Sequence, residues 1–200
     1  YRYLSGAFDS RVKNILKILG DIKGKKVLDI GCGGGYLSHE FCKRGAKEVV
    51  GMDYASFGIQ FAKARYPEID FRVGSVENLS SFEDSSFDIV TFIDTIEHVS
   101  RQDDAIANIK RVLKPSGKLL VATDVDDCAW QKPLFFKLIK ITHLFSKSGR
   151  AYRLIKKVEA QRRNTKNYHE THIAELSVEQ LESLLKKNNF KVIKHSVYPM

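Results

Sequence analysis

A glycine-rich turn at residues 31–35 follows a short apolar run, residues 25–30, and precedes a helical pattern that extends to about Arg44. A strand, a tight turn and a helix in this order direct backbone N–H groups at a ligand. The dinucleotide fingerprint needs a glycine where this chain has Tyr36, which disfavours that ligand class. Asp29, just before the turn, would repel a pyrophosphate but suits a ligand that carries an ammonium and a sulfonium group.

A second carboxylate, that of Asp53, ends the next strand-like segment, which starts at residue 48. A carboxylate in that place can accept hydrogen bonds from two ribose hydroxyls. A glycine turn alone is a weak signal, and a purely structural turn is the alternative interpretation. The prediction of a positively charged, ribose-containing ligand therefore depends on Asp29 and Asp53 together with the turn.

A third polar group, Asp94, Glu97 and His98, follows the fourth predicted strand, residues 87–93. In an open α/β sheet the ligand crevice lies beyond the carboxyl ends of the strands, where this group falls. One interpretation makes His98 a general base, since an imidazole titrates near neutral pH. A second gives all three residues to a divalent cation that lowers the pKa of an acceptor hydroxyl. In a third, the pair Glu97 and His98 is structural and the acid only caps the next helix.

The elements that must position these groups alternate along the chain. Strands are predicted over residues 25–30, 48–53, 70–73, 87–93 and 118–123, and helices over residues 9–19, 36–44, 57–65 and 101–113. A capping box from Ser100 to Asp103 opens the last of these helices, and a turn at residues 114–117 ends it. A helix at residues 178–187 and a strand at residues 190–197 follow later. This alternation predicts a mostly parallel sheet that is covered on both faces.

Several sequence blocks, taken with Asp53, resemble the class I S-adenosylmethionine-dependent methyltransferases. They lie at residues 27–35, 73–79, 86–90 and 111–117, in the order of that family. The resemblance implies a doubly wound, Rossmann-like α/β fold with a mostly parallel sheet, and a methyltransferase (transferase) activity. The layout is most similar to that of the ubiquinone-biosynthesis O-methyltransferases.

The resemblance implies S-adenosylmethionine as the cofactor, with Gly31 and Gly33 near its methionine part and Asp53 at its ribose. The loop after the third strand takes the adenine. Where the family has an acid this chain has Ser75, which leaves the adenine contact to Glu77 or to the backbone of Val76. The expected cofactor-binding residues are Asp29, Gly31, Cys32, Gly33, Gly35, Asp53, Tyr54, Val76, Glu77 and Asp94.

The resemblance also bears on the metal interpretation. The spacing from Asp94 to His98 is similar to the metal-binding Glu-x-x-Glu-His of ubiquinone-biosynthesis O-methyltransferases and of small-RNA 2′-O-methyltransferases. In the latter a further histidine comes after the fifth strand, and His172 corresponds to it, with His169 as its neighbour. The expected metal set is thus Asp94, Glu97, His98 and His172, with Mg²⁺ or Mn²⁺ as the ion, although the short Asp94 side chain weakens this case. The expected catalytic residues are His98 and Glu97.

The net charge of +9 is concentrated in one segment, because residues 131–168 hold eleven Lys or Arg and a single acid, Glu159. This basic insert follows the fifth strand and begins with an amphipathic pattern at residues 130–146. Three roles stay open for it: a lid over the acceptor, a peripheral membrane contact through residues 130–147, or RNA binding. The predicted reaction is O-methylation of a small-molecule or lipid-linked hydroxyl. The alternatives are RNA 2′-O-methylation and a non-catalytic, cofactor-binding scaffold.

Composition limits the class of protein further. Three cysteines without a CxxC pair argue against a disulfide framework and against a thiolate zinc site. No run of about 20 apolar residues and no leader pattern occur, so we expect a cytoplasmic protein, with a membrane-peripheral one as the alternative. We expect one domain over residues 1–200, comprising a cofactor core (21–124), a helical cap (125–170) and a last helix and strand (171–200). The family's seventh strand would require a tail beyond Met200.

Overall fold

The computed structural model describes residues 5–123 and 176–193, with side chains from residue 12 onward. The elements are, in chain order, α1 (Ser5–Leu19), β1 (Lys26–Ile30), α2 (Tyr36–Lys43), β2 (Glu48–Asp53), α3 (Ser56–Arg65), β3 (Asp70–Val73), β4 (Phe87–Ile93), the 3₁₀ turn η1 (Ile96–His98), α4 (Gln102–Val112), β5 (Leu113–Ala122) and α8 (Val178–Lys187). They fall into two units, residues 1–96 with 101–123, and residues 97–100 with 124–200.

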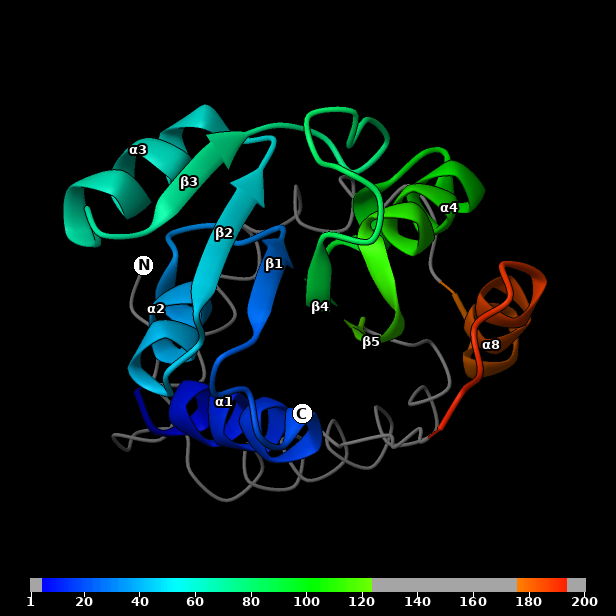
Figure 1. Ribbon diagram of the computed structural model, residues 1–200, viewed down its shortest axis with the longest axis horizontal. Helices are drawn as coiled ribbons and strands as arrows, with labels where there is room; N and C mark the ends of the chain where they lie inside the picture. The colour runs from blue at the N-terminus through cyan, green and yellow to red at the C-terminus, as the bar shows by residue number, and fades with distance from the viewer. Residues whose placement is uncertain (1–4, 124–175, 194–200) are drawn as a thin grey trace, which may run out of the picture. The chain divides into compact units, whose positions relative to one another are not determined.

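The first unit contains a five-stranded sheet in the order β3-β2-β1-β4-β5, in which every pairing is parallel (Figure 1). The order reverses between β1 and β4, and the crevice beyond such a reversal is where open α/β sheets bind ligands. At this central position Asp29 of β1 stands in register with Gly51 on one side and Thr91 on the other. The predicted α/β fold with a mostly parallel sheet is confirmed.

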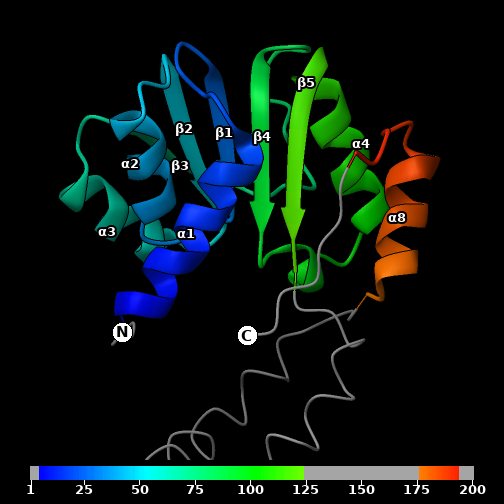
Figure 2. The ribbon, with the colours of Figure 1, turned by 90° about the horizontal axis from the view of Figure 1, so that it is seen from below.

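Alternate residues of the strands enter two different apolar layers, as expected for a sheet that is buried on both faces. On one face Val27, Val49 and Ile89 pack in a cluster with α1, α2 and α3. The opposite face presents residues such as Leu28, and the apolar side of α4 is fully buried. Figure 2 shows α1 in front of the strands and α4 beyond β5. Both layers hold the strands rigid, and their carboxyl ends are thereby fixed in relation to one another.

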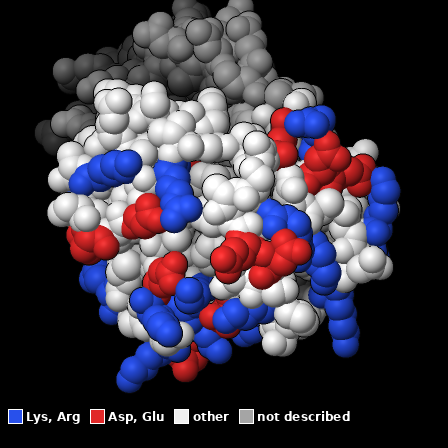
Figure 3. Space-filling model, turned by 45° about the horizontal axis from the view of Figure 1, so that its top comes forward, with Lys and Arg blue, Asp and Glu red and all other residues white. Residues whose placement is uncertain are grey.

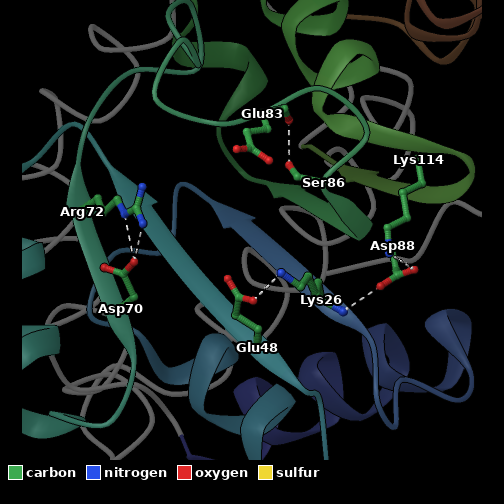
Figure 4. A network of polar contacts seen from close by, with 8 residues as sticks. All are labelled: Lys26, Glu48, Asp70, Arg72, Glu83, Ser86, Asp88 and Lys114. Carbon is green, nitrogen blue, oxygen red and sulfur yellow. Dashed lines mark hydrogen bonds and ion pairs between the residues drawn. The ribbon is translucent and has the colours of Figure 1, made fainter.

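Polar contacts join the amino ends of the strands, at the opposite edge of the sheet from the glycine turn. On the face shown in Figure 3, Lys and Arg side chains are interspersed with Asp and Glu. Asp88 of β4 accepts a hydrogen bond from the Lys26 backbone N–H at 2.9 Å and pairs with the Lys114 ammonium at 2.8 Å (Figure 4). The Lys26 side chain pairs in turn with Glu48 at 2.7 Å. Three neighbouring strands and β5 are thus connected where they begin.

Two predicted boundaries are wrong, and at one of them pairing between strands prevails over a local turn signal. The predicted turn at residues 114–117 lies inside β5, which already pairs with β4 through Leu113 and Phe87. The next pair joins Lys118 to Ile89, so β4 advances by two residues while β5 advances by five. The extra residues form an irregularity in an otherwise regular ladder. Helix α1 begins at Ser5 instead of residue 9.

The predicted capping box from Ser100 to Asp103 stays a prediction. The N-cap of α4 is Arg101, one residue later, and its side chain makes no capping hydrogen bond. The Glu77 carboxylate instead accepts the Arg101 backbone N–H at 2.9 Å. A contact from a distant loop therefore satisfies one backbone N–H at the start of this helix.

In the second unit, α8 starts from a complete capping box in which Ser177 and Gln180 exchange side-chain and backbone hydrogen bonds. The strand predicted at residues 190–197 is wrong over 190–193, which are not in a strand, and the remainder lies outside the described residues. The predicted cap at residues 125–170 lies outside them as well. None of the helices described here has the length and hydropathy to cross a bilayer.

Candidate cofactor-binding and active site

The turn between β1 and α2 is a backbone structure that only glycine fits well. Gly31, Gly33 and Gly35 all have positive φ, at 75°, 51° and 79°. A Cβ on Gly31 would lie 1.9 Å from the Thr95 Oγ1, and one on Gly35 would lie 2.5 Å from the Phe71 ring. A Cβ on Gly33 would meet no atom of the described residues within 4 Å. Within this part of the chain the side of Gly33 is therefore open, as a ligand that rests on the turn requires.

Backbone hydrogen bonds tie the turn to the end of β2. The Gly31 and Cys32 N–H groups both donate to the Met52 carbonyl, at 2.7 and 3.1 Å. The Gly33 N–H donates to the Asp53 Oδ2 at 2.8 Å. The glycine turn and the carboxyl end of β2 thus form one structure, which brings together the two features that the sequence analysis linked by pattern only.

Asp53 holds this arrangement from the last position of β2. Its Oδ2 accepts the Gly33 N–H, and its Oδ1 accepts the Ala55 N–H at 2.8 Å. Each carboxylate oxygen can accept more than one hydrogen bond, so both retain capacity for ligand hydroxyls. Asp53 is half-buried, which keeps the carboxylate accessible at the edge of the turn.

Asp29 lies deeper, with 2% of its surface exposed. Its Oδ2 accepts a hydrogen bond from the Ser38 hydroxyl and its Oδ1 one from the Thr91 hydroxyl, both at 2.7 Å. Burial raises the pKa of Asp29 to about 6, the negative charge of Asp53 adds to that rise, and the two hydroxyls oppose it. The sequence analysis placed Asp29 at the ligand but missed Ser38 and Thr91, because partners on α2 and β4 leave no local pattern.

Cys32 contributes to the turn through its backbone. Burial, and then the negative charge of Asp29, raise the pKa of the Cys32 thiol well above its usual range. Its sulfur would lie 3.0 Å from a Cβ on Gly51 of β2, so the side chain packs toward the strand. Such a protonated, packed thiol has the properties of a structural residue and not those of a nucleophile.

The predicted adenine-binding residues after β3 are held by α4. Val76 is buried, and its carbonyl and that of Glu77 accept hydrogen bonds from the Asn108 side-chain amide, at 3.2 and 2.9 Å. The Glu77 carboxylate caps α4 and pairs with the Arg101 guanidinium at 3.3 Å. The Ser75 hydroxyl accepts the Glu77 N–H at 3.2 Å. Helix α4 therefore fixes this loop, through partners 24 to 32 residues away that the sequence analysis missed.

Exposed apolar side chains surround the ends of β2 and β3. Tyr54 and Phe57 are each 77% exposed, Phe61 is 52% exposed and Val73 is 57% exposed. Val73 pairs with Asp53 in the sheet, and the Phe61 ring would lie 3.3 Å from a Cβ on Gly34 in the turn. Tyr54 was expected from the sequence, whereas the phenylalanines of α3 were not. These side chains give the glycine turn an apolar border on which a flat base could rest.

Asp94 begins the loop that leaves β4. It has a positive φ of 47°, and its N–H donates to the Ala122 carbonyl of β5 at 2.8 Å. The neighbouring Thr95 hydroxyl donates to the Ile93 carbonyl at 2.7 Å and lies directly against Gly31. The loop after β4 is therefore packed on the glycine turn, and Asp94 lies at the same edge of the sheet as Asp53.

The predicted catalytic residues belong to η1. Glu97 is 3% exposed and His98 is half-buried, and both fall in the second unit of the chain. Among residues 5–123 and 176–193, no group of three or more His, Cys, Asp or Glu side chains is arranged to hold a metal ion. His172 and its neighbour His169 lie outside these ranges. The roles of Glu97 and His98 as base or metal ligands stay predictions.

Known proteins share this core. A family profile described as a methyltransferase domain matches residues 28–121. Ubiquinone biosynthesis O-methyltransferases from Alkalilimnicola ehrlichii and Xanthomonas oryzae are 33% identical over 117 residues and 40% identical over 107 residues. The matches cover 56% and 52% of this chain and 47% and 44% of those proteins. A protein from Pyrococcus horikoshii OT3 with a solved structure is 34% identical to this chain in sequence, with a TM-score of 0.57. The match covers 65% of this chain and 65% of that protein.

This chain thus spans about half the length of the curated relatives that it matches. The matched segment contains every strand of the sheet except the first two residues of β1 and the last of β5, the glycine turn and Asp53. The strand order, the turn tied to the end of β2 and the family match agree with one another. Over residues 28–121 the chain is therefore similar to a methyltransferase domain.

Proposed function

We propose that this protein transfers a methyl group from S-adenosylmethionine to a hydroxyl of a small or lipid-linked molecule. The observation that carries the proposal is the joint structure of the left-handed glycine turn and Asp53, linked by the 2.8 Å hydrogen bond from Gly33. Its backbone fits a ligand that lies flat on the turn and presents hydroxyls to a carboxylate. The matched relatives are named as O-methyltransferases, which supports a hydroxyl as the acceptor.

Residues of the first unit would hold the cofactor. The proposal assigns the ribose hydroxyls to Asp53, which is supported by its contact with the turn, and the methionine part to the open side of Gly33. It assigns the adenine to Tyr54 and the loop from Val76 to Glu77. The buried charge of Asp29 favours the positive charge of the ligand. When bound, S-adenosylmethionine supplies the methyl group as part of a sulfonium.

Methyl transfer is an in-line displacement, so the acceptor must be aligned and its hydroxyl proton removed. Our proposal gives the proton to His98, with Glu97 as its neighbour, at the carboxyl end of β4. The alternative assigns Asp94, Glu97, His98 and His172 to Mg²⁺ or Mn²⁺, which would lower the pKa of the acceptor hydroxyl. The motif resemblance supports both versions, and a metal titration separates them.

Partners and location follow from the acceptor. A lipid-linked acceptor would agree with peripheral membrane contact through residues 130–147 of a cytoplasmic protein. RNA 2′-O-methylation is the second candidate, favoured by the net charge of +10 within residues 131–168. On the face shown in Figure 3 both signs of charge are mixed, which gives RNA no continuous basic surface there. A cofactor-binding scaffold without turnover is the non-enzyme alternative.

Calorimetric titration with S-adenosylmethionine, followed by turnover on a panel of catechol, phenol and lipid-linked hydroxyl acceptors, tests the proposal. We expect Asp53→Ala to weaken cofactor binding at least tenfold, because it loses the ribose partner and the support of the Gly33 N–H. Asp70→Ala is the matched control, since that carboxylate pairs with Arg72 on the exposed edge strand β3. Binding by the wild type with no turnover on any acceptor would favour the scaffold, and no binding at all would contradict the proposal.

A further inference from the structure

Two buried hydroxyls outside the expected cofactor-binding set converge on one carboxylate. Ser38 of α2 and Thr91 of β4 are fully buried, and each donates a 2.7 Å hydrogen bond to a different oxygen of Asp29. Thr91 stands directly opposite Asp29 in the parallel ladder between β4 and β1. Burial of a hydroxyl without a hydrogen-bond partner costs free energy in an apolar layer. The Asp29 carboxylate supplies this partner to both hydroxyls.

The contacts connect three elements around the glycine turn. Asp29 precedes the turn and Ser38 follows it by three residues, so their hydrogen bond closes the strand–turn–helix unit from within. Thr91 joins the same carboxylate to β4, two residues before that strand ends. Thr95 provides a second connection between β4 and the turn through its contact with Gly31. The turn is therefore held at its start, at its end and from the strand that leads to Asp94.

We infer that Ser38 and Thr91 are positioning residues for the cofactor, which act by holding the Asp29 carboxylate in place and in its charged form. The inference rests on the proposed function, since it concerns the same ligand. Hydrogen bonds donated to a carboxylate stabilise the ionised state, and only that state attracts an ammonium or a sulfonium. With one hydroxyl removed, the buried carboxylate would bind a proton more readily and lose its attraction for the ligand at neutral pH.

Few other titratable groups act on Asp29 from the neighbouring elements. Asp53 at the end of β2 opposes ionisation of Asp29 by its negative charge, and the Cys32 thiol of the turn stays protonated beside it. The charged side chains of α2 face elsewhere, since His39 stacks on Tyr66 and Glu40 pairs with Lys43. On β4, Asp88 faces Lys26 and Lys114 at the opposite end of the strand. The two hydroxyls are thus the main groups that favour the charged form.

The test is the pH dependence of S-adenosylmethionine binding, measured by calorimetry from pH 5.5 to 8.5 for the wild type, Ser38→Ala, Thr91→Val and Thr91→Ser. The wild type should lose affinity below about pH 6. In Ser38→Ala and Thr91→Val we expect this midpoint to rise by about one pH unit, with a loss of affinity of about twofold at pH 7 that is larger at pH 6.5 and is recovered at pH 8.5. Thr91→Ser keeps the hydroxyl and should restore the wild-type profile.

Ser86→Ala is the control, because that hydroxyl donates to the Glu83 carbonyl at 2.8 Å at the amino edge of the sheet. Equal weakening of binding by Ser38→Ala at every pH, or an unchanged profile, would overturn the inference and leave a purely structural cross-link. These outcomes differ from failure of the proposed function, in which the wild type itself would not bind S-adenosylmethionine. Should Thr91→Val fail to fold, Ser38→Ala and Thr91→Ser still decide the question.

Discussion

At the scale of single residues, the site combines positions that are costly for folding with positions that a ligand needs. Gly31 adopts a left-handed conformation against Thr95, and Asp29 is a carboxylate with almost no contact with water. Neither arrangement benefits the folded chain by itself. Strain and buried charge of this kind concentrate at functional sites, where the surrounding structure enforces them.

Replacement of Gly31 by alanine should destabilise the protein through two separate effects. The first is backbone strain at a φ of 75°, and the second is the overlap of a Cβ with the Thr95 hydroxyl at 1.9 Å. Gly24 has a φ of 71° and no atom within 4 Å of its Cβ position, so Gly24→Ala carries the strain alone. In urea unfolding we expect the free energy of unfolding to fall by about 1 kcal/mol for Gly24→Ala and by about 2–4 kcal/mol for Gly31→Ala. Equal losses would show that Thr95 moves aside freely.

Asp29→Asn should stabilise the protein at neutral pH while it weakens cofactor binding. The folded-state pKa of about 6 lies above the reference value of 3.8, so the folded protein holds this proton more tightly than the unfolded chain. The resulting stability is fully present below about pH 4 and is lost as the pH rises through 6. Asparagine has no such charge and avoids that loss of stability. We therefore expect Asp29→Asn to raise the free energy of unfolding by about 1–2 kcal/mol at pH 7.5, and this gain should disappear near pH 4.

Thermal unfolding at both pH values measures the effect, with the exposed Asp70→Asn as the control, for which a change of at most about 0.5 kcal/mol is expected. Destabilisation by Asp29→Asn at pH 7.5 would mean that the charged form contributes more through its two hydrogen bonds than burial costs.

At the scale of elements, the two ends of the strands are specialised for different tasks. The amino ends are held together by charged partners around Asp88 (Figure 4). The carboxyl ends carry the glycine turn and its supports. Local sequence patterns predicted the strands well but missed the supports. The contact from Glu77 to Arg101 spans 24 residues and that from Asp29 to Thr91 spans 62, so no local periodicity encodes them.

Asp88→Asn should lower stability without any effect on the cofactor site. The Lys114 ammonium, followed by the Lys26 backbone N–H, lowers the pKa of Asp88, which therefore stabilises the fold when ionised. This contribution is present above the unfolded-state pKa and is lost as the pH falls through the lower folded-state value. We expect Asp88→Asn to lower the free energy of unfolding by about 1 kcal/mol at pH 7 and by less toward pH 3. Asp29→Asn, in contrast, should raise the free energy of unfolding at neutral pH. A change in S-adenosylmethionine affinity would contradict the separation of the two edges.

At the scale of the whole molecule, the parts differ in how far sequence could predict them. The alternation of strands and helices led directly to the parallel sheet, because buried parallel strands give continuous apolar runs. The proposed cofactor residues follow from a motif whose geometry is fixed by glycine, and the structure joins two of them, Gly33 and Asp53, by a hydrogen bond. The catalytic assignment is of another kind, since a Glu-His pair after β4 has the same spacing whether it is a base, a metal site or a structural turn.

A metal titration resolves that last ambiguity in protein that includes residue His172. Protein saturated with S-adenosylhomocysteine is titrated with Mg²⁺ and with Mn²⁺, because the carboxylates and imidazoles of the expected set suit such ions. If the reaction is metal-assisted, binding of the metal ion is saturable in the wild type and is abolished in Glu97→Gln. Turnover is then lost when a chelator is added and is restored by Mn²⁺. Glu83→Gln is the control, because Glu83 is an exposed residue of the loop between β3 and β4.

If neither ion binds, metal assistance is refuted and His98 is left to act as a base without metal. In that case the pH–rate profile should show an ascending limb, and His98→Ala should remove it. Loss of the limb would confirm that proton transfer passes through His98. An unchanged profile would exclude His98 as the base.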